Sequence, residues 1–389
     1  MDSFLGAKKD VFIYVKVFYN RHCRHSLREC KVCFCIKSCA KEAAKVIYSK
    51  NITMLEIADQ LGLSRTTVHK ALNSLPGVND KTKERVQQFA RQVGYRPNLM
   101  ARSLRSRKTN MIGVLISVDF DRRWYASLAN KLINSLRGRG YSVLLTMAAP
   151  EDLEDERKCV ELLQCGNIDG IIAGPVLMRK RMQPYWDVVN RGQPIVFFGS
   201  AEELPASFVD IDHIEGLRLA VKHLVGFGHK RIGYLCCHEE PAVLNTRRYG
   251  FERAMIESGL LTKSEDMLVG RGTYESGYKT MKSCLERRDV KDMPTAFFCQ
   301  SDVAAIGAMR VLGEHGISVP EDISLVGYDD IQEAAYCKPS LTTVGGSMDL
   351  LVRRLQEILI GQIENGGKPV QEYIKPQLVI RESVAKAKR

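Results

Sequence analysis

From residue 111 onward, short apolar runs alternate with amphipathic segments. The apolar runs predict β-strands, and segments whose apolar residues recur every three or four positions predict helices. Strands are expected at 112–118, 141–146, 170–173, 194–198, 231–236, 267–270, 296–299 and 324–328, and helices at 125–138, 151–165, 184–191, 213–227, 245–258, 274–287 and 302–315. This alternation predicts parallel sheets with helices on both faces. Because about 275 residues exceed one comfortable open sheet, we expect two doubly wound lobes with a cleft between them.

Residues 51–97 show the pattern of three short helices. Thr53, with Glu56 three residues later, predicts a capping box for the first helix, and Gly62 permits a sharp turn after it. Ser64 then caps the second helix. Three short helices with a glycine turn between the first two predict a helix-turn-helix unit. A plain three-helix bundle that contacts another protein has the same pattern.

The second of these helices, over residues 65–72, exposes Arg65, Thr66 and Lys70. The second helix of a helix-turn-helix unit fits the major groove of DNA, where its exposed residues reach base edges. Arg65 and Lys70 suit the acceptors of guanine, and Thr66 suits several bases. We therefore predict that these three residues contact bases.

The excess positive charge of the chain is confined to its first 110 residues. The net charge is +12, and residues 1–50 and 51–110 each hold 11 Lys and Arg against 4 Asp and Glu, whereas residues 111–389 hold 35 against 37. A basic head on a near-neutral body indicates a polyanionic partner, which is usually nucleic acid. A solvated basic face is the alternative.

The segment over residues 98–110 connects the head to the body. Residues 99–107 hold three arginines and are too short to form a stable helix alone in water. Leu104, an apolar residue next to Arg102 and other arginines, suits a hinge helix that orders in the minor groove, where the leucine opens a base step. A basic solvated linker is the alternative.

The composition excludes several classes of protein. The chain has 389 residues, of which 45% are hydrophobic and 26% are charged, so it is not disordered throughout. Its 12 cysteines are too sparse for a disulfide scaffold. No stretch approaches ~18 uninterrupted apolar residues, and the apolar run at 11–19 is a poor signal peptide, so we expect a cytoplasmic protein without a membrane partner.

The first 50 residues are basic and rich in cysteine. Cys30, Cys33, Cys35 and Cys39 lie close together, and four thiolates can bind Zn²⁺. Their spacing matches no structural zinc motif, however. We therefore expect either a disordered extension or a start codon assigned too far upstream, and no metal site.

The body lacks the motifs of common catalytic sites, including GxSxG, HExxH, GxxxxGK[ST] and GxGxxG. The carboxylates and imidazole over residues 210–213 suit a metal site, but a helix cap after a strand fits them better. Asp329 and Asp330 follow a strand, where they suit either paired-acid catalysis or hydrogen bonding to a ligand. We therefore expect that the chain is not an enzyme and that it holds no cofactor.

Short motifs spread over about 85% of the chain point to one family. In the head and hinge they are Ile57-Ala58, Gly62-Leu63-Ser64, Thr67-Val68, Ala71-Leu72-Asn73, Gly94-Tyr95-Arg96-Pro97-Asn98 and Ala101-Arg102-Ser103-Leu104. In the body they are Ile112-Gly113-Val114, Asp169-Gly170-Ile171-Ile172, Gly228-His229-Lys230-Arg231-Ile232-Gly233, Arg247 with Gly250-Phe251, Ser301-Asp302, Val326-Gly327-Tyr328-Asp329-Asp330 and Pro339-Ser340-Leu341-Thr342-Thr343-Val344. With these motifs the chain resembles the LacI/GalR family of bacterial transcription regulators.

The resemblance implies an α/β protein in which a small all-α helix-turn-helix head is joined by a hinge helix to a two-lobed, periplasmic-binding-protein-like core. It implies a ligand-responsive repressor of carbohydrate-related genes that binds a pseudo-palindromic DNA operator as a homodimer. The expected domains are an N-terminal extension (1–50), the head (51–97), the hinge (98–110), a first lobe (about 111–211 and 345–374) and a second lobe (about 212–341 and 375–389). A solute-binding protein of a sugar transporter and a carbohydrate-active enzyme are the alternatives.

The resemblance also implies roles for individual residues. It places Arg65, Thr66 and Lys70 at bases, Leu104 and Arg102 in the minor groove, and Thr53, Ser64 and Asn73 at phosphates or helix caps. The effector positions carry Trp124, Tyr125, Arg247, Ser301 and Asp329. An aromatic pair can pack on the apolar face of a sugar, and Arg and Asp can bind its hydroxyls, a carboxylate or a phosphate. Core packing is the alternative for the two aromatic residues.

Three positions depart from the family's pattern. Ser301-Asp302 stands where the family commonly has Asn-Asp, and Asp212-His213 stands where it commonly has Asp-Asn. The segment before Trp124 carries Arg122 and Arg123 and has no Asn-Pro. Either the effector is unusual or it is more acidic than a neutral sugar.

Overall fold

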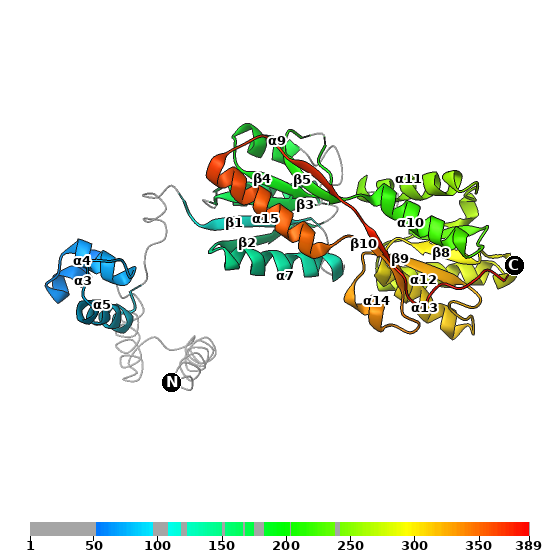
Figure 1. Ribbon diagram of the computed structural model, residues 1–389, viewed down its shortest axis with the longest axis horizontal. Helices are drawn as coiled ribbons and strands as arrows, with labels where there is room; N and C mark the ends of the chain where they lie inside the picture. Colours follow the sequence, from blue (N-terminus) through cyan, green and yellow to red (C-terminus); the bar gives the residue numbers. More distant parts are fainter. Residues whose placement is uncertain are drawn as a thin grey trace, which may run out of the picture. The chain divides into compact units, whose positions relative to one another are not determined.

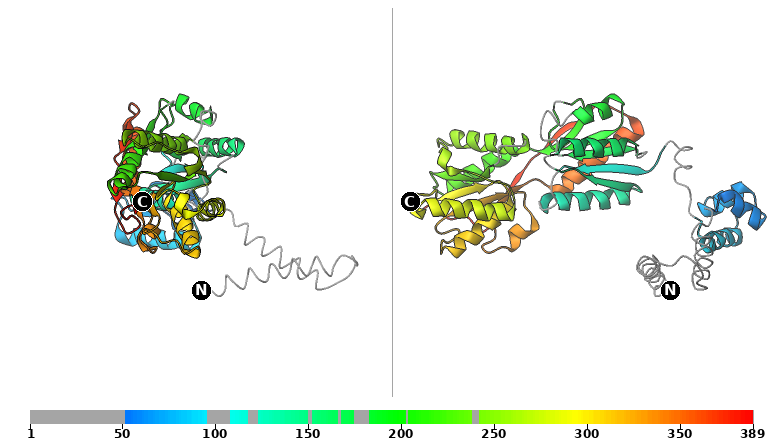
Figure 2. Two further views of the ribbon diagram at one scale, coloured as in Figure 1. Left: turned by 90° about the vertical axis from the view of Figure 1, so that its right-hand side faces the viewer. Right: turned by 180° about the vertical axis from the view of Figure 1, so that it is seen from behind.

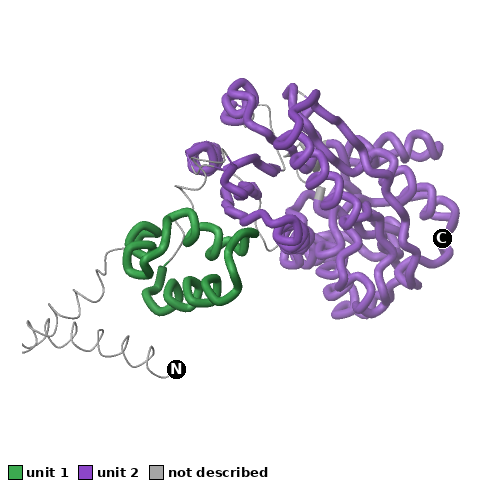
Figure 3. Tube along the Cα trace, turned by 60° about the vertical axis from the view of Figure 1, so that its left-hand side comes forward, with its two compact units in different colours: residues 1–99 green, residues 100–389 purple. Residues whose placement is uncertain are grey.

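A computed structural model of the chain describes residues 52–95, 108–117, 123–149, 152–165, 168–174, 183–202, 204–237 and 242–388. The chain divides into two compact units, residues 1–99 and 100–389 (Figure 3), and each is described by itself. In the described segments, no helix is both long enough and apolar enough to cross a membrane.

The described part of the first unit is built from α3 (Met54–Leu61), α4 (Arg65–Leu72) and α5 (Asp80–Gln92) (Figure 1). Small and branched side chains from all three helices form its core, namely Ile57, Ala58, Val68, Ala71, Val86 and Ala90. Between α3 and α4, Gly62 adopts the left-handed conformation, with φ of 62°, which a residue without Cβ adopts at no steric cost. The predicted helix-turn-helix head is thereby confirmed.

In the second unit, the first lobe is a parallel sheet with the strand order β11-β5-β4-β3-β1-β2 (Figures 1 and 2). Its strands are β1 (Met111–Ile116), β2 (Ser142–Met147), β3 (Gly170–Gly174), β4 (Ile195–Phe198), β5 (Ser207–Ile211) and β11 (Gln371–Ile374). Its helices are α7 (Arg123–Gly138), α8 (Leu153–Cys165), α9 (Gln183–Asn190) and α15 (Met348–Asn365). Alternate residues of β1 pack on opposite faces: Val114 contacts the α7 and α15 side, and Leu115 contacts the α8 and α9 side.

The second lobe repeats this arrangement with the strand order β12-β10-β9-β8-β6-β7, in which β12 alone among the described strands pairs antiparallel. Its strands are β6 (Ile232–Cys237), β7 (Met267–Val269), β8 (Ala296–Cys299), β9 (Ser324–Tyr328), β10 (Thr342–Gly345) and β12 (Gln377–Val379). Its helices are α10 (His213–Gly226), α11 (Ala242–Glu257), α12 (Tyr274–Arg287), α13 (Asp302–Glu314) and α14 (Gln332–Tyr336). Helices α10 and α11 cover one face of the sheet, and α12 to α14 cover the other. The predicted α/β architecture with two doubly wound lobes is confirmed.

The chain passes between the lobes after β5, after β10 and after β11. The lobe bounds expected from the sequence place the second crossing between residues 341 and 345, and in the structure it follows Gly345, the last residue of β10. The crossings pack tightly, because a Cβ at Gly346 would lie 2.8 Å from a side-chain carbon of Ile211. The sequence pattern did not predict β5, β10, β11, β12, α14 or α15. All of these except α15 are at most five residues long.

Candidate functional site

Helix α4 of the head presents a polar and basic face. Arg65 and Thr66 are exposed and Lys70 is half-buried, whereas Val68 and Ala71 on the opposite face are buried in the core. This division follows from the helical period, which places the two apolar residues on one side. The three residues predicted to contact bases thus lie on or beside one accessible surface.

Thr53, Ser64 and Asn73, predicted as phosphate contacts or caps, all cap helices in the structure. Thr53 forms a capping box with Glu56, in which each side chain bonds the other residue's backbone N–H. The Ser64 hydroxyl accepts from the Thr67 N–H at 3.0 Å, and the Asn73 amide donates to the His69 carbonyl at 2.8 Å. The predicted hinge residues Leu104 and Arg102 and the N-terminal cysteines lie outside the described residues.

In the second lobe, Arg247 on α11 reaches the residues that follow strands β8 and β9. Its guanidinium lies 3.9 Å from the centroid of the Tyr328 ring, donates from Nη1 to the Gln300 carbonyl at 2.8 Å, and pairs from Nη2 with Asp329 Oδ1 at 3.2 Å. The Nε atom of Arg247 is buried and has no hydrogen-bond partner in the described part of the chain. The structure therefore brings two of the predicted effector residues, Arg247 and Asp329, together at the carboxyl edge of the sheet.

The electrostatics of this cluster keep Arg247 charged. Burial lowers the pKa of its guanidinium, but the Asp329 carboxylate and the phenols of Tyr328 and Tyr125 outweigh burial, so the pKa lies above its ordinary value. Tyr125 lies on α7 of the first lobe, so this raising effect on the pKa of Arg247 comes from both lobes. A buried, permanently charged donor suits an anionic or strongly accepting ligand group.

Asp329 and Asp330 face different partners. Asp329 is bound to Arg247, whereas Asp330 pairs with Arg381 at 2.7 Å, so the two carboxylates do not share a site as a catalytic pair would. Both residues have positive φ, 113° and 50°, and such strain in residues other than glycine clusters at functional sites. The backbone N–H of Asp329 donates to the Val344 carbonyl at 2.7 Å, which holds the strained turn against β10.

Ser301, another predicted effector residue, has a structural role. Its hydroxyl accepts from the Ala304 N–H, which caps α13, and donates to the Gly272 carbonyl at 3.2 Å. The neighbouring Asp302 is fully buried, and burial, followed by the nearby Asp329, raises the pKa of its carboxyl group well above the ordinary value. Asp302 accepts from the Thr343 hydroxyl and from the Ile331 N–H, so it connects the start of α13 to β10 and to the segment between β9 and α14.

The aromatic pair lies in the first turn of α7, in the first lobe. The Trp124 and Tyr125 rings meet edge to face with centroids 4.9 Å apart. Trp124 packs against the cores of both lobes, and both side chains remain partly exposed. Arg123 beside them reaches the second lobe, where its Nε lies 3.3 Å from Glu333 Oε1. The pair thus combines the core packing and the accessible surface that the sequence left as alternatives.

His213 was not predicted as part of this site. Its Nδ1 atom is hydrogen-bonded to the Tyr328 hydroxyl at 2.7 Å, and its Nε2 atom lies 3.5 Å from Asp210 Oδ1. Asp212 caps α10, as expected, by accepting from the Glu215 N–H. Among the described residues, no three His, Cys, Asp or Glu side chains are placed to hold a metal ion. His213 thus connects a lobe crossing to the ring on which Arg247 lies.

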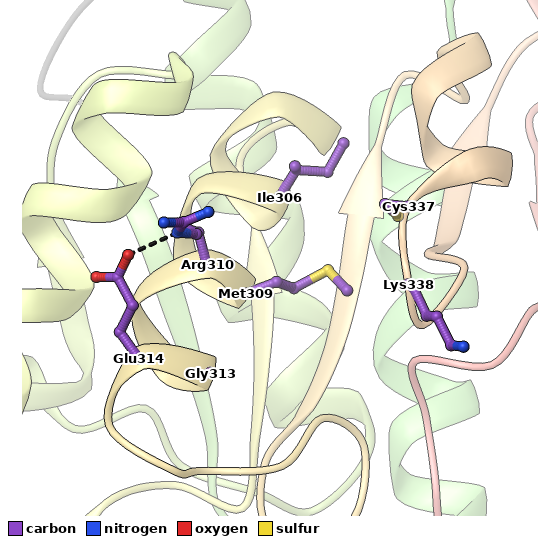
Figure 4. Close-up of a pocket in the computed structure, with 7 residues that line it drawn as sticks. All are labelled: Ile306, Met309, Arg310, Gly313, Glu314, Cys337 and Lys338. Carbon is purple, nitrogen blue, oxygen red and sulfur yellow. Dashed lines mark hydrogen bonds and ion pairs between the residues drawn. The ribbon is translucent and has the colours of Figure 1, made fainter.

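A separate pocket of about 490 Å³ lies between α13 and the segment that follows α14 (Figure 4). It is lined by Ile306, Met309, Arg310, Gly313, Glu314, Cys337 and Lys338, and Arg310 pairs with Glu314 beside it. None of the predicted effector residues lines this pocket.

Comparisons with known proteins agree with this architecture. Residues 53–98 match the family described as bacterial regulatory proteins, lacI family, and residues 221–384 match a periplasmic binding protein-like domain. The HTH-type transcriptional repressor PurR of Haemophilus influenzae (strain PittEE) is 33% identical over 340 residues, which cover 85% of this chain and 98% of that protein. The repressor of the same name from Mannheimia succiniciproducens is 32% identical over 340 residues, with 86% and 99% covered.

Solved structures give the same result. The Lac repressor dimer bound to operator and the anti-inducer ONPF has a TM-score of 0.77 and 25% identity, and the match covers 86% of this chain and all of that chain. A complex of the transcriptional regulator CelR with cellobiose has a TM-score of 0.64 and 27% identity, with 85% and 99% covered.

The chain therefore belongs to the lacI family of bacterial regulatory proteins. It is a DNA-binding transcriptional repressor with a ligand-binding domain, and it is not an enzyme. Its partners are operator DNA and a small-molecule effector.

Proposed function

We propose that this repressor binds a pseudo-palindromic operator as a homodimer, with Arg65, Thr66 and Lys70 at base edges and the segment around Leu104 in the central minor groove. The exposed face of α4 supports the base contacts. The solved relative described as a Lac repressor dimer bound to operator supports the assembly. A two-fold dimer places two recognition helices on related half-sites, so the operator follows the same symmetry.

The effector site lies at the carboxyl edge of the second lobe's sheet, where Arg247 and Asp329 meet, and is completed by Trp124 and Tyr125 from the first lobe. The single observation that carries this proposal is the buried Arg247 guanidinium, whose Nε has no partner among the described residues. Parallel sheets bind ligands at this edge. Ser301 contributes by shaping the start of α13 rather than by offering a free hydroxyl.

The effector is a small polar molecule with an accepting or acidic group that Arg247 binds. A sugar derivative with a carbonyl or acidic oxygen fits the cluster better than a neutral sugar, because a buried guanidinium is stabilised most by a charge-assisted or strongly accepting partner. A planar base that packs on the aromatic pair is the other class to test.

Mapping of the DNA sites that the protein binds in its host tests the proposal as a whole. We expect the DNA sites to be two-fold symmetric and to lie next to genes whose products process the effector. Among the metabolites of those gene products, we expect one that changes the affinity of the protein for its operator. Asymmetric DNA sites would contradict the dimer. An effector whose binding is unaffected by Arg247→Lys would contradict the proposed effector site.

A further inference from the structure

Gln300 lies at the point of the second lobe where the strand order reverses. The chain runs from β6 to the edge strand β7 and then returns across β6 to β8, and Gln300 directly follows β8. In doubly wound sheets, ligands bind outside the carboxyl ends of the strands at this switch point. The side chain is 2% exposed, so it belongs to the interior of the site.

The contacts of Gln300 leave one strong donor unused. Its backbone carbonyl accepts from Arg247 Nη1 at 2.8 Å, and its side-chain Oε1 accepts from the Tyr234 hydroxyl, which orients the amide. Its Nε2 atom is buried and has no partner in the part of the chain that the structure describes, and the same holds for Arg247 Nε. Buried donors without partners are rare because each costs free energy. Two such donors on residues that contact each other in space therefore require an explanation.

We propose that Gln300 is a specificity-determining residue of the effector site, and that its amide N–H donates to an acceptor on the ligand beside the group bound by Arg247. This inference rests on the effector cleft proposed above. The ligand carries at least two acceptors on one edge, as in the carboxylate of a sugar acid or the oxygen and ring-nitrogen edge of a nucleobase. A site built to donate to such a group discriminates against analogues that lack it.

Two pairs of probes separate a nucleobase from a sugar acid, because the first member of each pair carries a carbonyl or carboxylate group that the second lacks. Hypoxanthine is compared with purine, and D-glucuronate with D-glucose, by calorimetric titration of the full-length protein and of Gln300→Glu. Glutamate keeps an oxygen for the Tyr234 hydroxyl and removes the N–H donor. In one pair we expect the wild type to prefer the acceptor-bearing member by about 10–100-fold, and the variant to lose most of that preference.

Three further variants keep the result interpretable. Gln183→Glu makes the same chemical change at an exposed position and should retain the wild-type preference. Tyr234→Phe removes the hydroxyl that orients the Gln300 amide and adds no charge. It should reduce the ratio of affinities between the two members of the probe pair. Arg247→Lys tests the cleft itself, because lysine keeps the charge and lacks Nε.

The outcomes distinguish the inference from the proposed function. If Arg247→Lys weakens a probe and Gln300→Glu keeps the full wild-type preference, the cleft stands and the role of Gln300 is wrong. If neither variant alters binding of a probe, the cleft is wrong as well. Failure of both acceptor-bearing probes to bind at millimolar concentration overturns the assignment of the ligand class.

Discussion

Arg123 at the start of α7 and Glu333 on α14 form an ion pair between the two lobes, with Nε and Oε1 3.3 Å apart. The two side chains are 61% and 40% exposed, so the pair is screened by solvent and contributes little. It nevertheless acts only when the lobes adopt this arrangement, in which Trp124 packs against both cores. We therefore expect the pair to favour this arrangement of the lobes slightly.

Glu333→Gln should weaken effector binding by up to about fivefold at low salt, and the difference should shrink as salt is added. The physical reason is that an effector in the proposed site would contact both lobes, so it would bind best to the arrangement that the pair supports. Calorimetry at two salt concentrations measures this. Glu275→Gln, which breaks an exposed pair within α12, is the matched control and should change nothing. An equal loss at both salt concentrations would contradict the electrostatic origin.

Asp329→Asn should lower effector affinity at least about tenfold and remove the effect of the ligand on operator binding. The variant keeps the shape of the side chain but loses the charge opposite Arg247. Typical couplings between effector and DNA of roughly 5–150-fold in affinity would then vanish. Titration of operator DNA with and without effector measures the response. The control, Asp330→Asn, alters the carboxylate that pairs with Arg381 and should retain the response; an unchanged response in Asp329→Asn would place the effector elsewhere.

Arg65→Ala should cost about 1–3 kcal/mol in operator binding and relax the preference at one base position. The expectation follows from the exposure of Arg65 at the start of α4. Competition between operator variants and random DNA measures both quantities. Lys81→Ala removes an exposed charge from α5 and should leave sequence preference intact. Equal weakening of operator and random DNA by Arg65→Ala would show that the residue contacts phosphate only.

The stability of the second lobe should fall as the pH drops below about 6.5, partly through His229. Burial lowers the pKa of this imidazole, whose nitrogens are hydrogen-bonded to the Thr295 hydroxyl at 2.9 Å and the Ala385 carbonyl at 3.1 Å. The unfolded chain therefore takes up a proton at a higher pH than the folded chain. The contribution of His229 to the free energy of unfolding is complete above the pKa of the imidazole in the unfolded chain. It is lost as the pH falls through the pKa of the imidazole in the folded chain.

His229→Gln should flatten this pH dependence, since glutamine does not titrate. Urea unfolding of wild type and variant at pH 8 and pH 5.5 measures the difference in free energy of unfolding. The gap between the two proteins should be larger at pH 8 than at pH 5.5. A gap that stays constant with pH would show that His229 contributes packing and hydrogen bonds but no proton linkage.

The amino-acid sequence alone determined the helix-turn-helix head and most elements of the body. The capping box of Thr53 and Glu56, the turn at Gly62 and the strand–helix alternation depend on residues three or four apart, or on runs of apolar residues. Such interactions are local, so their pattern is visible in the chain before it folds. The motifs also indicated Arg247 and Asp329 as effector residues, although they are 82 residues apart.

The tertiary structure alone decided how those residues work together. The stacking of Arg247 on Tyr328, the contact of His213 with Tyr328 across 115 residues, and the bond from the Ser301 hydroxyl to the Gly272 carbonyl depend on which strands lie side by side. Short strands such as β10 and β11 are held by pairing with distant segments, and four residues carry too little periodicity to reveal them. The buried donor of Gln300 is likewise invisible in sequence, because an unpaired hydrogen bond is a property of everything that surrounds the atom.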